Sequence, residues 1–357
     1  MPVSSSTLVV TIRAARRRAR HRLFAISALA LIIAVVAVGI GPVPLPPGDV
    51  LGVLGHHLWG LPLEERLAGT TDLIVWNTRV PRVAMAIVAG VGLAVAGTVM
   101  QALLRNDLAD PYLLGLNSGA SSTVAFAVLV AGGVTGVLLS GVALLGAVGA
   151  VLLAILLAGG ARARGPLRII LAGLAVGYAL NAVTSFLIFI SDRPEAAQSV
   201  LFWLLGSLAS IQPAVLLVAA IVTVVVVAIL LRISPYLDAI ASGDESALSA
   251  GLDPERSRLI TLTVTSAMVG VIVAGVGGIG FVGLVIPHLA RALVGTRLRI
   301  AIPASAALGA ALLVIADSFA RTALAPQEIP VGVVTGAIGA PFLIVLLRRQ
   351  STRSAGG

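Results

Sequence analysis

Residues 79–120 read RVPRVAMAIVAGVGLAVAGTVMQALLRNDLADPYLLGLNSGA. The apolar part after Arg82 is rich in glycine and alanine and is about twenty residues long, the length that a helix needs to cross a bilayer. The turn that follows, from Arg105 to Pro111, is too charged to face lipid, and another apolar run begins directly after it. The stretch therefore predicts one membrane crossing, an aqueous turn and a return into the membrane.

The composition of the whole chain also indicates a membrane protein. Of the 357 residues, 58% are hydrophobic and only 11% are charged, whereas a soluble domain has about 25% charged residues. The chain has no cysteine, which excludes disulfides and thiolate metal sites. All 24 basic residues are arginine, so the chain lacks the phosphate-binding lysine of a P-loop ATPase.

Apolar runs of about twenty residues predict an all-α polytopic membrane protein with about ten transmembrane helices. The runs lie near residues 23–41, 82–104, 113–133, 136–158, 168–190, 211–231, 259–279, 280–296, 300–320 and 331–347. The first run is longer than the core of a signal peptide, so we expect an uncleaved span. The segment 199–210 is too short to span and is expected to be a half-helix or a surface helix.

The arginine distribution predicts the orientation. With the N-terminus inside, 19 of the 24 arginines fall in inner segments and five in outer segments, so both termini are expected in the cytoplasm. We thus expect a basic cytoplasmic tail at 1–22, a transmembrane domain at 23–348 and a cytoplasmic tail at 349–357. Topology and anionic lipid explain the basic N-terminus better than nucleic acid does. The outer loop 42–78 and the inner loop 232–258 are long enough to serve as docking platforms.

A short internal repeat accompanies this topology. The hexapeptide IVAGVG occurs at 87–92 and again at 272–277, in spans predicted to run in opposite directions. Inverted-topology halves of transporters produce this pattern, and chance similarity in a chain rich in valine, alanine and glycine also produces it.

The predicted spans offer little reactive chemistry. No charged residue lies in the middle of a span, and Asp317 lies close to an outer end, which counts against an ion-coupled secondary transporter, the alternative of a different class. Neutral polar residues in the spans, Asn117, Ser118 and Asn181 among them, fit either a water-filled path or contacts between helices. His56 and His57 fit either a metal site or an interfacial helix, and the second fits better. We predict no catalytic residue, no metal site and no cofactor in this chain.

Four segments, taken together, resemble a known family. They are RVPR at 79–82 with QALLRNDLADPYLLGLNSGA at 101–120, FWLLGSL at 202–208, GGIGFVGLVIPHLARALVG at 277–295, and PQEIPVGVVTGAIGAPFLIVLL at 326–347. They closely resemble the permease subunits of ABC importers (type II) for iron–siderophore complexes, haem and vitamin B12, and the likeness covers about residues 20–350.

The resemblance implies a multi-pass permease of the cytoplasmic membrane that works as a homodimer or beside a paralogous permease. It further implies two cytoplasmic ATPase subunits, which bind ATP and Mg²⁺, and a periplasmic or lipid-anchored substrate-binding protein. An iron(III)–siderophore complex is the expected substrate, with haem or vitamin B12 as alternatives. The missing P-loop lysine fits this division of labour.

The resemblance also assigns outer contacts. Arg79, Arg82 and Arg321 match positions at which outer arginines form ion pairs with glutamates of the binding protein. Arginine–carboxylate pairs are short and directional, so such contacts would orient a two-lobed partner. The alternative is that these arginines anchor helix ends at the membrane interface.

Two inner sites follow from the same resemblance. Residues 242–258 match the region that couples to the ATPase, and the candidate residues there are Gly243, Asp244, Glu245, Ala247 and Gly251. The candidate inner gate is formed by Asn106, Leu108, Pro166 and Leu167. Asp107 stands where a proline is usual, and 165–167 lacks the small hydroxyl residues of some relatives, so the gate of this chain differs locally.

Overall fold

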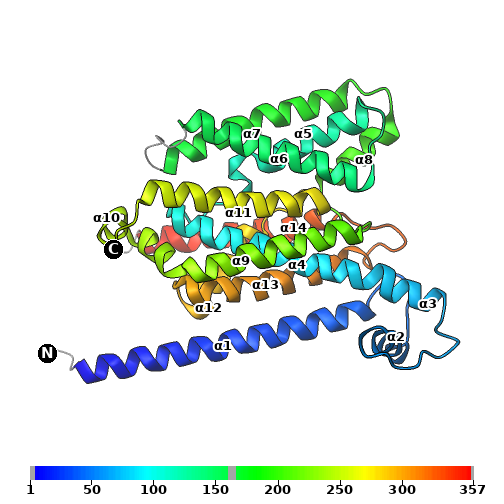
Figure 1. Cartoon of the computed structure of the whole chain (residues 1–357), viewed down its shortest axis with the longest axis horizontal. Helices are drawn as coiled ribbons and strands as arrows, with labels where there is room; N and C mark the ends of the chain where they lie inside the picture. Colours follow the sequence, from blue (N-terminus) through cyan, green and yellow to red (C-terminus); the bar gives the residue numbers. More distant parts are fainter. Residues whose placement is uncertain (1–4, 160–165, 355–357) are drawn as a thin grey trace.

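The computed structural model describes residues 5–159 and 166–354, and throughout these two ranges the chain is helical without any strand (Figure 1). In this part of the chain, seven helices are long and apolar enough to cross a membrane. They belong to α1 (Ser5–Gly39), α4 (Val80–Leu104), α6 (Gly136–Ala158), α7 (Pro166–Phe189), α9 (Pro213–Ser242), α11 (Pro254–Val276) and α13 (Leu298–Ala320).

Three further apolar helices are shorter: α5 (Leu116–Leu129), α12 (Val282–Val294) and α14 (Val331–Ser354), whose apolar part is Val331–Leu346. Each of the ten predicted spans overlaps one of these ten helices. The all-α membrane fold is therefore confirmed, while the number of crossings stays a prediction because the three shorter helices fall below the spanning length.

Short elements connect the long helices. They are α2 (Pro47–Trp59), α3 (Thr70–Asp72), the π-helical turn η1 (Leu73–Arg79), the 3₁₀ turn η2 (Pro111–Leu114), α8 (Pro194–Leu204) and α10 (Asp244–Ser249). Helix α8 lies where the sequence predicts a half-helix or a surface helix.

Helix ends differ from the predicted loop boundaries. Helix α9 continues to Ser242, past the predicted end at 231, because Leu237 and Ile240 are buried one helical turn apart. The inner loop is consequently confined to 243–253. Helix α1 is continuous from Ser5, so the described part of the basic tail belongs to the same helix as the first span. Helix α14 likewise continues to Ser354.

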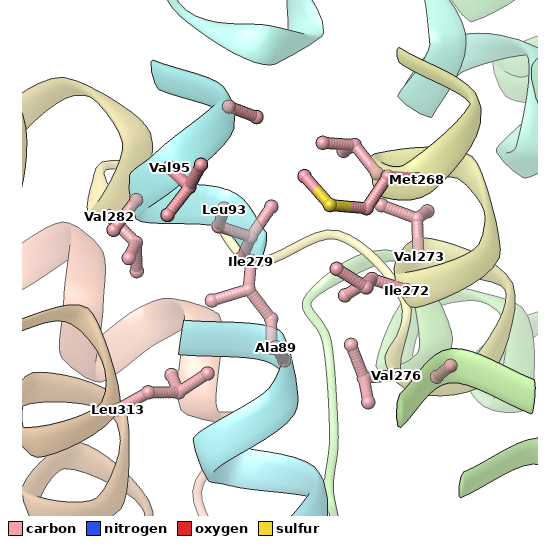
Figure 2. Packing of buried hydrophobic residues seen from close by; sticks show 14 of the residues in the cluster. Ala89, Leu93, Val95, Met268, Ile272, Val273, Val276, Ile279, Val282 and Leu313 are labelled. Atoms are coloured by element: carbon pink, nitrogen blue, oxygen red, sulfur yellow. The ribbon is translucent and has the colours of Figure 1, made fainter. Parts of the chain in front are cut away.

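Helix α4 is the centre of the packing. Figure 2 shows Leu93 of α4 between Ile272 of α11 and Leu313 of α13, and all three side chains are buried. Glycines let neighbouring backbones approach α4 closely, since a Cβ on Gly90 would overlap the carbonyl oxygen of Gly309 on α13. Small residues at such crossings are the usual means of packing helices in lipid.

The two copies of the hexapeptide lie in α4 and α11, which pack against each other in opposite directions. Met85 approaches Gly275, a Cβ on Gly92 would overlap Ile272, and Arg258 reaches Leu103. The antiparallel arrangement agrees with the predicted directions, and the origin of the repeat remains a hypothesis.

The bundle has two distinct ends (Figure 1). One end, here called the α10 end, carries α10, the start of α1 and the end of α14. The opposite end, the α2 end, carries α2 and α3. The arginine distribution predicts that the α10 end faces the cytoplasm.

Candidate functional site

The turn after α4 holds two of the predicted gate residues. Arg105 ends α4 in the left-handed region at φ 47°, which reverses the chain at once. The Oδ1 atom of Asn106 then accepts a hydrogen bond from the Leu108 amide at 2.9 Å, which closes a tight local turn. Asn106 is exposed, and Leu108 is 42% exposed at the α10 end. This segment is called the gate turn (105–108) below.

The gate turn is attached to α12 through the carboxylate of Asp107. Arg291 Nη2 donates to Asp107 Oδ1 at 2.8 Å and to Gln101 Oε1 at 2.8 Å. The Gln101 amide in turn donates to the carbonyl oxygens of Gly283 and Leu284 at 3.3 and 3.2 Å. Arg291 of α12 therefore joins the end of α4 and the gate turn in one hydrogen-bonded group.

The predicted coupling residues surround α10 and contact the gate turn. Asp244 Oδ1 accepts from Arg105 of the gate turn and from Arg258 Nη2, the latter at 2.9 Å. Arg258 is buried, and its Nε atom donates to the carbonyl oxygen of Leu103 at 3.1 Å. One carboxylate thus links α10, the gate turn and the start of α11.

The remaining coupling residues divide into structural and exposed positions. Gly243 at φ 135° and Gly251 at φ 76° flank α10 in conformations that favour glycine. Ala247 is fully buried, whereas Glu245 is exposed and Leu248 is 61% exposed. Leu248 was not among the residues that the sequence analysis selected.

The other half of the predicted gate lies at the start of α7, also at the α10 end (Figure 1). Leu167 is 66% exposed there. Pro166 begins α7, but its side chain lies outside the described residues, as does Gly165. The structure therefore places Asn106 and Leu108 in one turn and Leu167 on a separate element.

The predicted docking arginines gather at the α2 end, where two of them share a buried carboxylate. Arg82 Nε donates to Asp317 Oδ1 at 2.9 Å, and Arg82 Nη1 donates to Glu328 Oε1 at 2.8 Å. Arg321 Nε lies 3.6 Å from Asp317 Oδ2. Arg82, Arg321 and Asp317 are 6, 2 and 1% exposed, so these charges are buried with their partners as electrostatics requires.

Arg79 and Arg321 also attach α1 to the bundle. Arg79 Nη1 donates to the carbonyl oxygen of Gly39 at 2.8 Å, and its Nη2 donates to that of Val43. Arg321 Nη2 donates to the carbonyl oxygen of Ala37 at 2.8 Å. All three predicted docking residues are thus engaged within the chain rather than exposed.

The histidines of the outer loop have partners within that loop. The His57 ring stacks on Trp76 with centroids 4.2 Å apart, and its Nε2 atom lies 2.7 Å from Asp72 Oδ1. His56 Nδ1 lies 2.8 Å from the carbonyl oxygen of Leu61. This arrangement is typical of a helix that packs on its neighbours, which is the better of the two sequence interpretations.

A polar cavity of about 340 Å³ lies between η2, α5 and α7. Three polar residues of the predicted spans meet in it: Asn117, Ser118 and Asn181. The sequence analysis missed Asp110, Tyr112 and Tyr178, which also line it. These residues come from three elements, so only the packing of η2 against α5 and α7 reveals them as one group.

The floor of this cavity is fixed by hydrogen bonds from the turn η2. Asp110 Oδ1 accepts from the Tyr112 amide at 2.8 Å, and burial raises the pKa of Asp110 to about 6 despite this bond. The Tyr112 hydroxyl donates to the Ile279 carbonyl and accepts from the Ile279 amide, both at 3.0 Å. These two bonds therefore attach η2, which lines the cavity, to the connection between α11 and α12.

Comparison with known proteins gives consistent results. The model of the FecCD transport family matches residues 29–349. The hemin transport permease HmuU of Yersinia pestis is 37% identical over 79% of this chain and 85% of its own length. The vitamin B12 permease BtuC of Klebsiella pneumoniae is 34% identical over 95% of this chain and 96% of its own.

Two further similarities extend this pattern. The Fe(3+)-citrate permease YfmE of Bacillus subtilis is 33% identical over 79% of this chain and 84% of its own length. Among solved structures, an inward-facing conformation of a metal-chelate type ABC transporter covers 92% of this chain and 99% of its own, with TM-score 0.77 and 29% identity.

Proposed function

The chain belongs to the FecCD transport family, and from this premise we propose that it moves an iron(III)–siderophore complex across the cytoplasmic membrane. As a family member it is a multi-pass membrane permease of an ABC importer rather than an enzyme. Such permeases work with a partner permease and with ATPase subunits.

The polar cavity between η2, α5 and α7 is the observation that supports an organic chelate as substrate. Its amide, hydroxyl and carboxyl groups come from Asn117, Ser118, Asn181, Tyr178 and Asp110. Hydrogen-bonding groups of this kind contact the periphery of an organic ligand and fix its orientation. The similarity to an Fe(3+)-citrate permease is consistent with an iron chelate, and the similarities to haem and vitamin B12 permeases fit the two alternatives equally.

Helix α10 is proposed to insert into a cleft of the cytoplasmic ATPase, which binds ATP and Mg²⁺, so that this chain needs no cofactor. Leu248 and Glu245 are the exposed side chains that would enter the cleft, and buried Ala247 holds α10 against α9. Because Asp244 is bonded to Arg105, a displacement of α10 would reach the gate turn directly. This link supports Asn106 and Leu108 as part of the inner gate, and we propose Pro166 and Leu167 at the start of α7 as its other part.

The α2 end is proposed to receive a substrate-binding protein, either periplasmic or lipid-anchored. Arg79, Arg82 and Arg321 lie there together, and Glu328, which is bonded to Arg82, is 29% exposed in its side chain. A glutamate of the binding protein would replace Glu328 on Arg82. We further propose a homodimer, with a paralogous permease as the alternative second subunit.

Reconstitution tests the proposed function. The permease, its ATPase and its binding protein are placed in liposomes, and uptake of ⁵⁵Fe-labelled siderophore, labelled haem and labelled cobalamin is compared with and without ATP. We expect ATP-dependent uptake of the siderophore complex. If only haem or only cobalamin is taken up, that compound is the substrate and the siderophore proposal is wrong. Uptake driven by a proton gradient without the ATPase would contradict the ABC mechanism and favour a secondary transporter.

A further inference from the structure

Three arginines line a second cavity, of about 420 Å³, at the α10 end of the bundle. Arg20 comes from α1, while Arg297 and Arg299 come from the start of α13. All three are exposed. Within the described residues, Arg20 and Arg299 form no ion pair, and the nearby carboxylate of Asp238 accepts from the Leu298 amide at 3.0 Å. The cavity therefore has an excess of positive charge and suits an anion.

Part of the wall of the same cavity is apolar. Leu23 and Ile300 line it and pack on a small buried cluster between α1, α12 and α13. That cluster consists of Ala19, Ala290, Val294 and Ala304. Beyond the cavity, α1 exposes Phe24 (77%) to its surroundings, as expected for a helix that faces lipid. An apolar wall does not stabilise the binding of a free phosphate ion. A phospholipid has acyl chains that can pack on this wall while its phosphate contacts the arginines.

The position of α1 is held by few polar contacts near this cavity. Arg22 Nη1 donates to the carbonyl oxygen of Leu293 at the end of α12, at 2.8 Å. Figure 1 shows α1 along the edge of the bundle, so one of its faces is left uncovered by protein. A ligand that contacts Arg20 and Arg299 together would bridge α1 and α13.

We propose that this cavity binds the phosphate of an anionic phospholipid in the cytoplasmic leaflet, with the acyl chains along α1 and α13. Guanidinium groups bind phosphate oxygens in a planar, bidentate manner, and basic pockets between helices on the cytoplasmic side suit anionic head groups. The lipid would fasten α1 to the bundle. This proposal rests on the predicted orientation of the chain and is independent of the transported substrate.

Lipid titration followed by native mass spectrometry tests the proposal. Phosphatidylglycerol is added to the purified permease, and the variant Arg20→Gln/Arg297→Gln/Arg299→Gln is compared with the wild type. A matched control, Arg18→Gln/Arg168→Gln/Arg232→Gln, removes the same charge from exposed arginines at the α10 end. We expect the site variant to bind phosphatidylglycerol on the order of tenfold to a hundredfold more weakly and the control to bind like the wild type.

Further arms distinguish lipid from free phosphate and loss of charge from loss of fold. Inorganic phosphate and zwitterionic phosphatidylcholine should not displace the bound phosphatidylglycerol. The variant Arg20→Lys/Arg297→Lys/Arg299→Lys keeps the charge but loses the bidentate geometry of the guanidinium groups, so it should recover part of the binding. The proposal is wrong if inorganic phosphate displaces the lipid, if site and control variants bind alike, or if the lysine variant binds no better than the glutamine variant.

Discussion

Asp107 of the gate turn accepts a hydrogen bond from Arg291 of α12 at 2.8 Å, and this contact holds the turn against the bundle. The Asp107 side chain is 54% exposed, so its ion pair contributes about 1 kcal/mol. An energy of this size is suited to a contact that breaks and re-forms, as the proposed gate at this turn requires.

Replacing Asp107 by asparagine should make the gate turn open more often. The ion pair with Arg291 is lost, and at about 1 kcal/mol the open population rises about fivefold. The chain has no native cysteine, and Ala109, which directly follows the gate turn, is fully buried, so Ala109→Cys would be labelled by a maleimide only when the turn opens. We expect faster labelling in the Asp107→Asn background.

Asp107→Glu is the matched control because it keeps the charge and should label like the wild-type background. Equal labelling rates for the asparagine and glutamate variants would show that the contact with Arg291 does not restrain the gate.

Asp244→Asn should reduce transport more than ATP hydrolysis. The substitution weakens the bonds to Arg105 and Arg258 and leaves α10 less firmly attached to the gate turn. We expect ATP-driven uptake to fall about tenfold, the equivalent of about 1.4 kcal/mol of coupling, with ATP hydrolysis near the wild-type rate. Asp192→Asn, which neutralises an exposed carboxylate outside the coupling region, is the control for charge. Unchanged uptake in Asp244→Asn would show that the contacts of Asp244 do not couple α10 to the gate turn.

The sequence predicted the helices well because apolar length is a local property. Each of the ten apolar runs overlaps a helix, and even the shortened inner loop keeps α10 within the predicted coupling region. The end of α9 was missed because Leu237 and Ile240 lie in a polar context, and only packing shows that they are buried.

The charge pairs could not be predicted from the sequence. Arg82 meets Asp317 across 235 positions of the chain, and Arg105 meets Asp244 across 139. Such pairs exist only because α4 lies beside α13 and its end lies beside α10. The resemblance predicts the arginines at 79, 82 and 321 as outer contacts, which stays a prediction, while their burial depends on the packing of α1, α4 and α13.

Arg82→Gln should destabilise the permease. It leaves Asp317 buried with only the longer contact to Arg321, and removing one partner of a buried pair costs about 3 kcal/mol. The melting temperature in detergent should fall by several degrees. Arg193→Gln, an exposed arginine just before α8, should melt like the wild type.

Melting and docking measurements together separate the two roles of Arg82. If Arg82→Gln keeps the wild-type melting temperature and loses affinity for the binding protein, the buried pair is not structural and docking is its main role. If it melts lower and binds normally, the docking assignment is wrong.

Asp110→Asn should change how stability depends on pH. Burial raises the pKa of Asp110 from 3.8 to about 6, so between these values the folded state holds a proton that the unfolded state has released. The contribution of Asp110 to stability is therefore most favourable below pH 4, falls as the pH rises to 6, and stays unfavourable above it. The shift corresponds to about 3 kcal/mol.

Asparagine has no such titration and can still accept the hydrogen bond from the Tyr112 amide, so the cap of η2 is preserved. We expect Asp110→Asn to melt above the wild type at pH 7, with the difference shrinking steadily down to pH 4. The exposed Asp192→Asn serves as control and should follow the wild-type curve. A difference between Asp110→Asn and the wild type that is the same at every pH would mean that Asp110 is not buried as a titrating group, and the cavity between η2, α5 and α7 would then be more open to water than the structure shows.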